Sequence, residues 1–182
     1  MILFFAEGEC DSDAFVRHCY AYFADIMNAA GNDYPREVGI IREYGEKPRF
    51  DRGGAHFSLS HSHGVLMLGI SHSEIGVDIE KIRPVNTERF GFPDVRDEKD
   101  FFRKWTERES WLKYTGAGLK DFRKPIAEDA HFEHFEAFEG YDACVCAEPQ
   151  NVTAYLIDLA QVEGGKPAGK TETNKTAVYP SK

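Results

Sequence analysis

Apolar side chains recur every three or four residues over residues 12–30, and this spacing predicts a helix whose apolar face begins at Phe15 and which ends at Gly31. A second helix is predicted over residues 99–115, where an apolar stripe is followed by Gly116 as a stop. The stripe of the first helix indicates a packing element, to which we assign no chemistry.

The remaining apolar positions predict short strands. Residues 57–62 and 65–70 form two strands around a tight turn at His63–Gly64. The second of these is apolar throughout, which is typical of a strand covered on both faces. The further strands are predicted within residues 75–80, 131–140, 141–148 and 151–159.

The order of elements is helix, strands, helix, strands, which predicts an α+β protein with two similar lobes. We expect residues 1–84 to form the N-terminal lobe and residues 85–163 the C-terminal lobe. The polar, Gly-, Lys- and Thr-rich stretch at 164–182 is predicted to be a flexible tail.

Composition and charge narrow the classes of function. The chain has 182 residues, of which 42% are hydrophobic, enough to build a core. With a net charge of −9, the chain as a whole lacks the positive charge that is typical of a nucleic-acid-binding protein. An acidic protein partner would have to bind a local basic patch. No apolar run is long enough to span a bilayer and the start has no basic signal region, so we expect a cytoplasmic protein without membrane contact.

The four cysteines do not support a zinc site or a disulfide framework. None of them forms a CxxC pair. Cys144 and Cys146 are two residues apart in a predicted strand, so they point to the same face as neighbouring core thiols.

Two carboxylates two residues apart are the first candidate chemistry. In the strand 76–80, Asp78 and Glu80 share one face while Val77 and Ile79 share the other. A hard cation such as Mg²⁺ binds between carboxylates placed in this way, together with substrate phosphates. The alternative is a solvated polar face on an edge strand.

The second helix adds a third carboxylate and a lysine. Glu109 falls within the apolar stripe of this helix, and Lys113 lies one turn further on at its edge. A carboxylate on a buried face is costly unless it is paired or binds a metal, although the two residues could also form a simple i, i+4 pair. With Asp78 and Glu80, they form a candidate site for a divalent metal and a phosphate.

Hydroxyls, imidazoles and a basic loop precede these residues. Ser60 and His61 can donate hydrogen bonds to a phosphate, although serines here are also ordinary turn residues. A metal cluster of His61, His63 and His72 is a second possibility. Residues 32–55 are predicted to be rich in loops, and this basic loop carries side chains that can attract a ligand with several phosphates, namely Arg42, Lys47, Arg49 and Arg52.

Taken together, these segments resemble the 4'-phosphopantetheinyl transferases of the surfactin-synthetase-activating type. The resemblance is carried by FSLSHS at 57–62, GVDIE at 76–80 and WTERESWLKYTGAGL at 105–119. It is extended by YGEKP at 44–48, with one extra residue, and by GYDACVCAE at 140–148. The motifs occur in the order that the family has, and the region before YGEKP is short and lacks the family's arginine-rich helix.

The resemblance implies a pseudo-twofold pair of α+β lobes with coenzyme A in the cleft between them. It implies that such a monomer transfers the 4'-phosphopantetheine arm of coenzyme A to a serine of an apo acyl- or peptidyl-carrier protein and releases 3',5'-ADP. Its implied site residues are Asp78, Glu80 and Glu109 for Mg²⁺, Glu109 and Lys113 for catalysis, and Lys47, Ser60 and His61 for the coenzyme. Glu109 would be the base and Lys113 would assist the leaving group.

Two other functions stay open at this point. A non-catalytic relative that binds coenzyme A or a carrier protein would account for the short N-terminal region. An unrelated metal-dependent phosphohydrolase would use His61 and His63 and would need no protein acceptor.

Overall fold

The computed structural model describes residues 1–90, 92 and 94–168, which form an α+β fold as predicted. The two helices are α1 (Ser12–Ala29) and α2 (Glu98–Thr115), each close to its predicted range. The longer strands are β1 (Ile2–Glu9), β4 (His56–Ser62), β5 (Val65–Ser71), β6 (Ile75–Lys81), β7 (Phe132–Phe135), β8 (Tyr141–Ala147) and β9 (Thr153–Leu156). Two-residue strands are β2 (Ile40–Ile41), β3 (Arg49–Phe50) and β10 (Lys166–Pro167), and short 3-10 turns are η1 (Thr87–Phe90), η2 (Leu119–Asp121) and η3 (Leu159–Gln161).

The first sheet is built around β1, a strand that the sequence analysis did not predict. Its neighbours run in the order β10-β1-β5-β4, with β9 parallel to β1 as a further partner. The side chains of Phe4 and Ala6 join the core under α1, whereas Leu3 and Phe5 join a second core on the opposite face. A near-continuous apolar run is what a strand buried on both faces requires.

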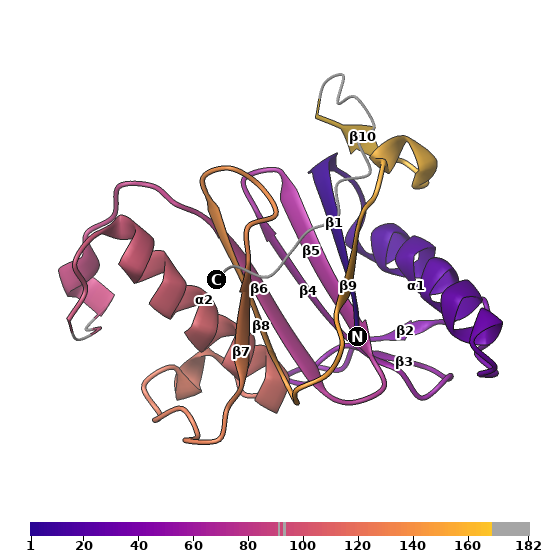
Figure 1. The fold of residues 1–182 in the computed structure, drawn as a ribbon, viewed down its shortest axis with the longest axis horizontal. Coiled ribbons are helices and arrows are strands. Elements are labelled where there is room, and N and C mark those ends of the chain that lie inside the picture. Colours follow the sequence, from indigo (N-terminus) through magenta and orange to yellow (C-terminus); the bar gives the residue numbers. More distant parts are fainter. Residues whose placement is uncertain (91, 93, 169–182) are drawn as a thin grey trace.

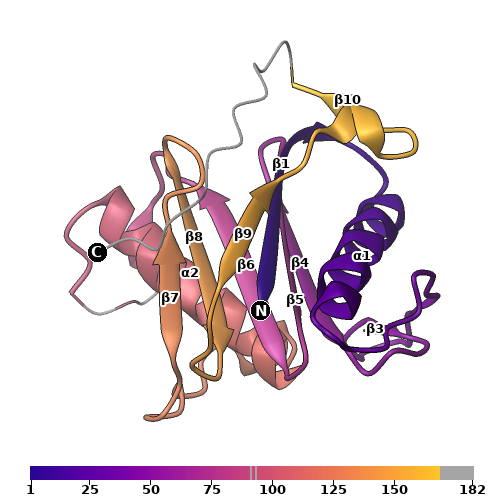
Figure 2. The same cartoon turned by 45° about the vertical axis from the view of Figure 1, so that its right-hand side comes forward.

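The second sheet has the order β6-β8-β7 and carries α2 on its outer face. Val77, Ile79 and Val145 point inward and share a core with Leu3 and Phe5 of the first sheet. The two helices therefore lie on opposite outer sides of the molecule with the strands between them (Figure 1 and, turned by 45°, Figure 2).

Strand pairing links parts of the chain that lie on both sides of the predicted boundary at residue 84. Strand β6 comes before this boundary and pairs with β8, which comes after it. Strand β9 comes after it and pairs with β1. Residues 166–167 of the predicted tail pair with β1 as β10, and residues 169–182 lie outside the described part of the chain.

Local sequence chemistry sets the ends of these elements. The N-cap of α1 is Asp11, and its carboxylate accepts from the backbone N–H of Ala14. The turn between β4 and β5 places both His63 and Gly64 at positive φ, as the predicted tight hairpin needs. Helix α2 ends at Gly116, which has a φ of 69°.

Helix α2 lies unusually close to β6 at one position. A Cβ atom added to Gly76 would be 1.9 Å from the carbonyl oxygen of Ser110 and 2.4 Å from the backbone nitrogen of Tyr114. Both atoms belong to the backbone of α2, so only a residue without a side chain allows this approach.

A buried ionic network joins α2 to β7 and β8. His134 is 5% exposed and lies between two carboxylates, with its Nε2 3.1 Å from Glu107 Oε1 and its Nδ1 3.1 Å from Asp142 Oδ2. Burial by itself lowers the pKa of His134, but hydrogen bonds to Asp142, Cys144 and Glu107 outweigh it and raise the pKa to about 11. We therefore treat His134 as an imidazolium at neutral pH.

Helices that could cross a membrane are not found among the described residues, because neither α1 nor α2 is sufficiently apolar over its length.

Gly76→Ala is expected to lower the free energy of unfolding by about 3 kcal/mol, because the new methyl group must push the backbone of α2 away from β6. Urea unfolding measures this change. Gly118→Ala is the matched control, since a Cβ there meets nothing within 4 Å. Equal midpoints for the two variants would contradict the close approach of α2 to β6.

The His134 network is expected to make stability fall at alkaline pH. The folded pKa of about 11 lies above the ordinary histidine pKa of 6.5, so the contribution of the network is complete below pH 6.5 and is lost as pH rises toward 11. Between these values, His134→Gln should remove a slope of at most about 1.4 kcal/mol per pH unit from the unfolding free energy. Wild type and variant with parallel pH profiles would show that His134 is neutral in the folded protein.

Candidate active site

Three serines on one face of β4 contact β6. The backbone N–H of Val77 donates to Ser58 Oγ at 3.0 Å, Ser60 Oγ donates to Asp78 Oδ1 at 2.7 Å, and Ser62 Oγ donates to Glu80 Oε2 at 2.8 Å. Successive serines are two residues apart on β4, and the two carboxylates are two residues apart on β6. Side chains at this spacing share one face of a strand, so Ser60 and Ser62 can face Asp78 and Glu80, respectively. We call Ser58, Ser60 and Ser62 with their β6 partners the serine seam.

Asp78 is the most buried carboxylate of the site. It is 4% exposed, and its Oδ1 accepts from both Ser60 and Lys113, whose Nζ lies 2.7 Å away. Its Oδ2 is buried and has no hydrogen-bond partner among the described residues. Burial raises the pKa of this carboxyl, against the opposing effects of Lys113 and Ser60.

Glu109 and Glu80 complete a group of three carboxylates. Glu109 is half-buried, and its pKa is raised by burial first and then by the negative charge of Asp78, while Lys113 acts in the opposite sense. Glu80 also accepts from Arg83 at 3.0 Å on the same oxygen that Ser62 contacts. The structure therefore brings Asp78, Glu80, Glu109 and Lys113 into electrostatic contact across β6 and α2.

The donor set fits a hard divalent cation, although the ligands are not preassembled. Across the part of the chain that the structure describes, no three His, Cys, Asp or Glu side chains are already arranged to hold a metal ion. The unpartnered Oδ2 of Asp78 and the mutual repulsion of the carboxylates are nevertheless what a cation would relieve. Carboxylate oxygens are the ligands that Mg²⁺ prefers.

The three residues predicted to bind the coenzyme lie in different surroundings. Ser60 is buried and directs its hydroxyl to Asp78, whereas His61 is exposed on the other face of β4. Lys47 Nζ contacts Glu74 Oε2 at 2.6 Å and the carbonyl oxygen of Ile75 at 2.7 Å. Lys47 is thus tied to the start of β6.

A cavity of about 400 Å³ lies beside Lys47. Three of the four residues of the predicted basic loop line it, namely Lys47, Arg49 and Arg52, together with His56 and Glu74. Arg42 instead pairs with Asp13 of α1. The cavity therefore combines basic side chains, each paired with a carboxylate, with the apolar residues Phe50 and Phe57. An anionic ligand with an apolar part could bind there in competition with those carboxylates.

Sequence reasoning missed the partners of the carboxylates. It assigned Ser60 to a phosphate and did not single out Ser62, yet both contact β6 carboxylates. The alternation of Ser58, Ser60 and Ser62 was the available signal, because three small hydroxyl residues on one strand face indicate a polar contact on that face.

The chain is similar to several known transferases. The chain is 34% identical to the 4'-phosphopantetheinyl transferase HetI of Nostoc sp. over 47% of this chain and 44% of HetI. It is 31% identical to the 4'-phosphopantetheinyl transferase Sfp of Bacillus subtilis, over 52% of this chain and 50% of Sfp. It is 28% identical to the 4'-phosphopantetheinyl transferase gsp of Aneurinibacillus migulanus, over 78% of this chain and 70% of that protein.

The chain spans about half the length of the first two of these relatives. No family model matches it. Several curated transferases at similar identity nevertheless agree with the resemblance drawn from the motifs around Ser60, Asp78 and Glu109. Over the part of the chain that they cover, these relatives support the superfamily of 4'-phosphopantetheinyl transferases, and its Sfp-like type.

Proposed function

We propose that this protein transfers the 4'-phosphopantetheine arm of coenzyme A to a serine of an apo acyl- or peptidyl-carrier protein and releases 3',5'-ADP. The proposal rests on one observation: Asp78 of β6 lies close to Glu109 and Lys113 of α2. All three residues belong to the motifs that carry the family resemblance. A binding module has no need for a half-buried carboxylate whose pKa is raised beside a lysine.

Asp78, Glu80 and Glu109 are the residues that would hold Mg²⁺. When bound, this cation neutralises the charge of the coenzyme's pyrophosphate and of the carboxylates themselves. Ser60 and Ser62 hold one oxygen of Asp78 and one oxygen of Glu80, which leaves the other oxygen of each side chain for a ligand. Such second contacts commonly orient metal-binding side chains.

Glu109 is placed to act as the base. Its raised pKa makes its carboxylate a stronger proton acceptor than an ordinary surface glutamate. In the proposed step it removes the proton of the carrier serine, directly or through a water molecule. The serine oxygen then bonds to the β-phosphorus of coenzyme A as the bond from that phosphorus to 3',5'-ADP breaks.

Lys113 is placed to stabilise the leaving group. Its ammonium has three N–H donors, of which one reaches Asp78 at 2.7 Å, so the others remain for phosphate oxygens. The negative charge that develops on the departing 3',5'-ADP is thereby met by a cation that Asp78 already orients.

The coenzyme's nucleotide end is proposed to occupy the cavity beside Lys47. Its lining of Lys47, Arg49 and Arg52 suits phosphate groups, and the contact of Lys47 with Ile75 joins the cavity to the first residue of β6. His61 is exposed on β4 and does not line this cavity, so its proposed contact with the coenzyme lies outside it.

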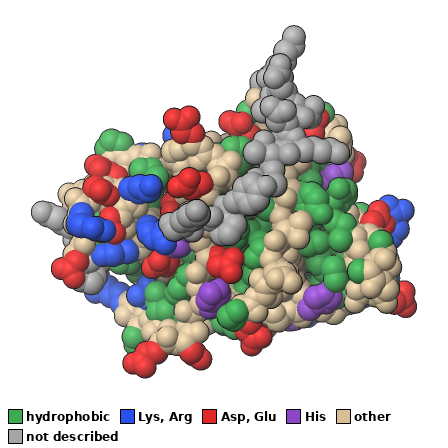
Figure 3. Space-filling view, in the orientation of Figure 1, with side chains coloured by type: hydrophobic (Ala, Val, Ile, Leu, Met, Phe, Trp, Pro, Cys, Tyr) green, Lys and Arg blue, Asp and Glu red, His purple; other side chains and the backbone are tan. Residues whose placement is uncertain are grey.

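The carrier protein is proposed to approach over α2. On the face shown in Figure 3, Lys and Arg side chains lie at the end of the molecule where α2 and the segment before it lie, interspersed with Asp and Glu. An acidic partner would have to contact these basic side chains, because the chain as a whole has a net charge of −9. We further propose that the chain acts as a cytoplasmic monomer, and that its two sheet-and-helix units are the pseudo-twofold lobes with coenzyme A between them.

Glu109→Gln is expected to abolish transfer, because the amide cannot accept the serine proton or carry the charge that a cation needs. The measurement is the intact mass of several apo carrier proteins after incubation with this protein, coenzyme A and Mg²⁺. Wild type should add one phosphopantetheine arm, the variant should not, and chelation of the metal should also stop transfer. Coenzyme A binding without any mass gain would favour a non-catalytic relative instead.

Ser60→Ala is expected to raise the Mg²⁺ concentration needed for half-maximal transfer by about 10-fold, because Asp78 loses a hydrogen bond that orients it. Ser58→Ala is the matched control, since Ser58 lies on the same face and accepts from the backbone of Val77 rather than touching a carboxylate. The same Mg²⁺ requirement in both variants would mean that Ser60 has only a structural role.

A further inference from the structure

The Glu107–His134–Asp142 network uses three ionisable groups that the proposed chemistry leaves aside. They come from α2, β7 and β8, respectively, and Thr106 Oγ1 also donates to Asp142 Oδ2 at 2.5 Å. His134 and Asp142 are buried and Glu107 is partly exposed, and burying ionisable groups is costly unless they are well partnered. This network contacts the helix that carries the proposed catalytic residues. It can therefore affect the position of those residues as well as the stability of the fold.

The spacing along α2 shows which side of the helix each residue occupies. At 100° per residue, Thr106 and Ser110 face β8, where they contact Asp142 and Cys144. Glu109 lies about 60° to one side of Thr106, and Glu107 lies about 100° to the other. The proposed catalytic pair therefore faces β6 from one flank of the helix while Glu107 faces β7 from the opposite flank.

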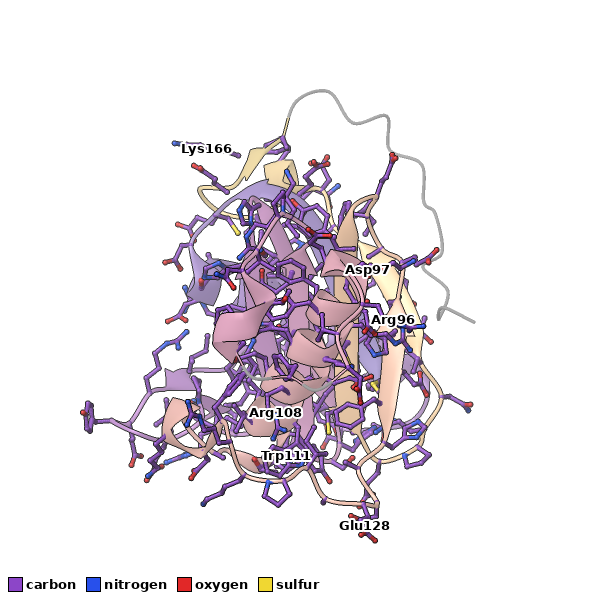
Figure 4. All side chains as sticks on the ribbon, turned by 90° about the vertical axis from the view of Figure 1, so that its left-hand side faces the viewer. Arg96, Asp97, Arg108, Trp111, Glu128 and Lys166 are labelled. Carbon is purple, nitrogen blue, oxygen red and sulfur yellow. The ribbon has the colours of Figure 1, made fainter. Side chains whose placement is uncertain are left out.

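Contacts on the outer side of α2 do not fix this orientation on the sheet. Arg108 donates to the carbonyl oxygen of Lys124 and lies over the ring of Trp111, and both side chains lie along the helix as seen in Figure 4. These contacts join α2 to the loop after it. The Lys113–Asp78 pair acts on the flank that faces β6, and Thr106 and Ser110 contact β8, so Glu107 supplies the polar contact on the flank that faces β7.

We propose that Glu107, His134 and Asp142 form a positioning network that fixes the rotation of α2 on its sheet and thereby aims Glu109 and Lys113 at Asp78. This inference rests on the proposed function for its effect on turnover. The network does not touch the reacting groups itself. It acts through α2, because even a small misplacement of a catalytic group lowers the rate of reaction.

Glu107→Ala is the variant that tests this role, because Glu107 is half-exposed and its loss leaves the buried His134–Asp142 pair intact. We expect kcat for pantetheine transfer to a panel of apo carrier proteins to fall by between about 10- and 100-fold, with the KM for coenzyme A unchanged. Glu107→Gln keeps an acceptor for His134 at the same position and should restore most of the lost turnover.

Glu98→Ala is the matched control, since it removes an exposed glutamate from the first turn of the same helix and should leave kcat unchanged. All rates are measured well below the unfolding midpoint of each variant. A Glu107→Ala enzyme with unchanged kcat, or one whose loss is equalled by Glu107→Gln, would overturn the positioning role.

A measurement that does not depend on activity separates this inference from the proposed function. Amide hydrogen exchange over residues 109–115 should become faster in Glu107→Ala but not in Glu107→Gln or Glu98→Ala. If the wild type transfers nothing to any carrier, the proposed function fails, and unchanged exchange would then overturn the positioning of α2 as well.

Discussion

The serine seam is the contact on which the arrangement of the site depends. In the described sheets, β4 pairs with β5 and β6 pairs with β8, so the edges of the two sheets meet without a backbone ladder between them. Hydroxyls supply the missing partners, because Ser58 and Ser62 accept from backbone N–H groups of β6. A buried backbone N–H without a partner costs free energy, so this edge contact is possible only with small polar side chains on β4.

The same seam also explains how Asp78 can be buried. A carboxylate that is 4% exposed needs partners, and it obtains one from β4 and one from α2, namely Ser60 and Lys113. Lys113 reaches it only because α2 lies directly against Gly76, where no side chain separates the helix from the strand. Each contact therefore depends on the one before it. The serine seam holds β6 in place, Gly76 of β6 allows α2 to pack closely, and α2 in turn places Lys113 beside Asp78.

Much of this could be predicted from the sequence where the signal is local. The two helices, the β4–β5 hairpin and the shared face of Asp78 and Glu80 follow from periodicity and turn residues. Strand β1 was missed because its apolar run has no alternation, a pattern typical of a strand buried on both faces but not specific to one. The partners of Lys47 and His134 were missed because they are distant in sequence, and no local pattern indicates which carboxylate a buried cation will meet.

The charges of the site show why a ligand is needed to complete it. Asp78, Glu80 and Glu109 face one lysine and one arginine, so burial and mutual repulsion leave negative charge that the described side chains do not balance. On the other flank of α2 the charges are balanced within the protein, because the imidazolium of His134 lies between the carboxylates of Glu107 and Asp142. One flank is thus closed by the protein's own charges, and the other is the flank on which we propose that a cation and phosphates bind. A helix fixed on its closed flank can keep its open flank ready without first binding the ligand, and this preorganisation is what electrostatic catalysis requires.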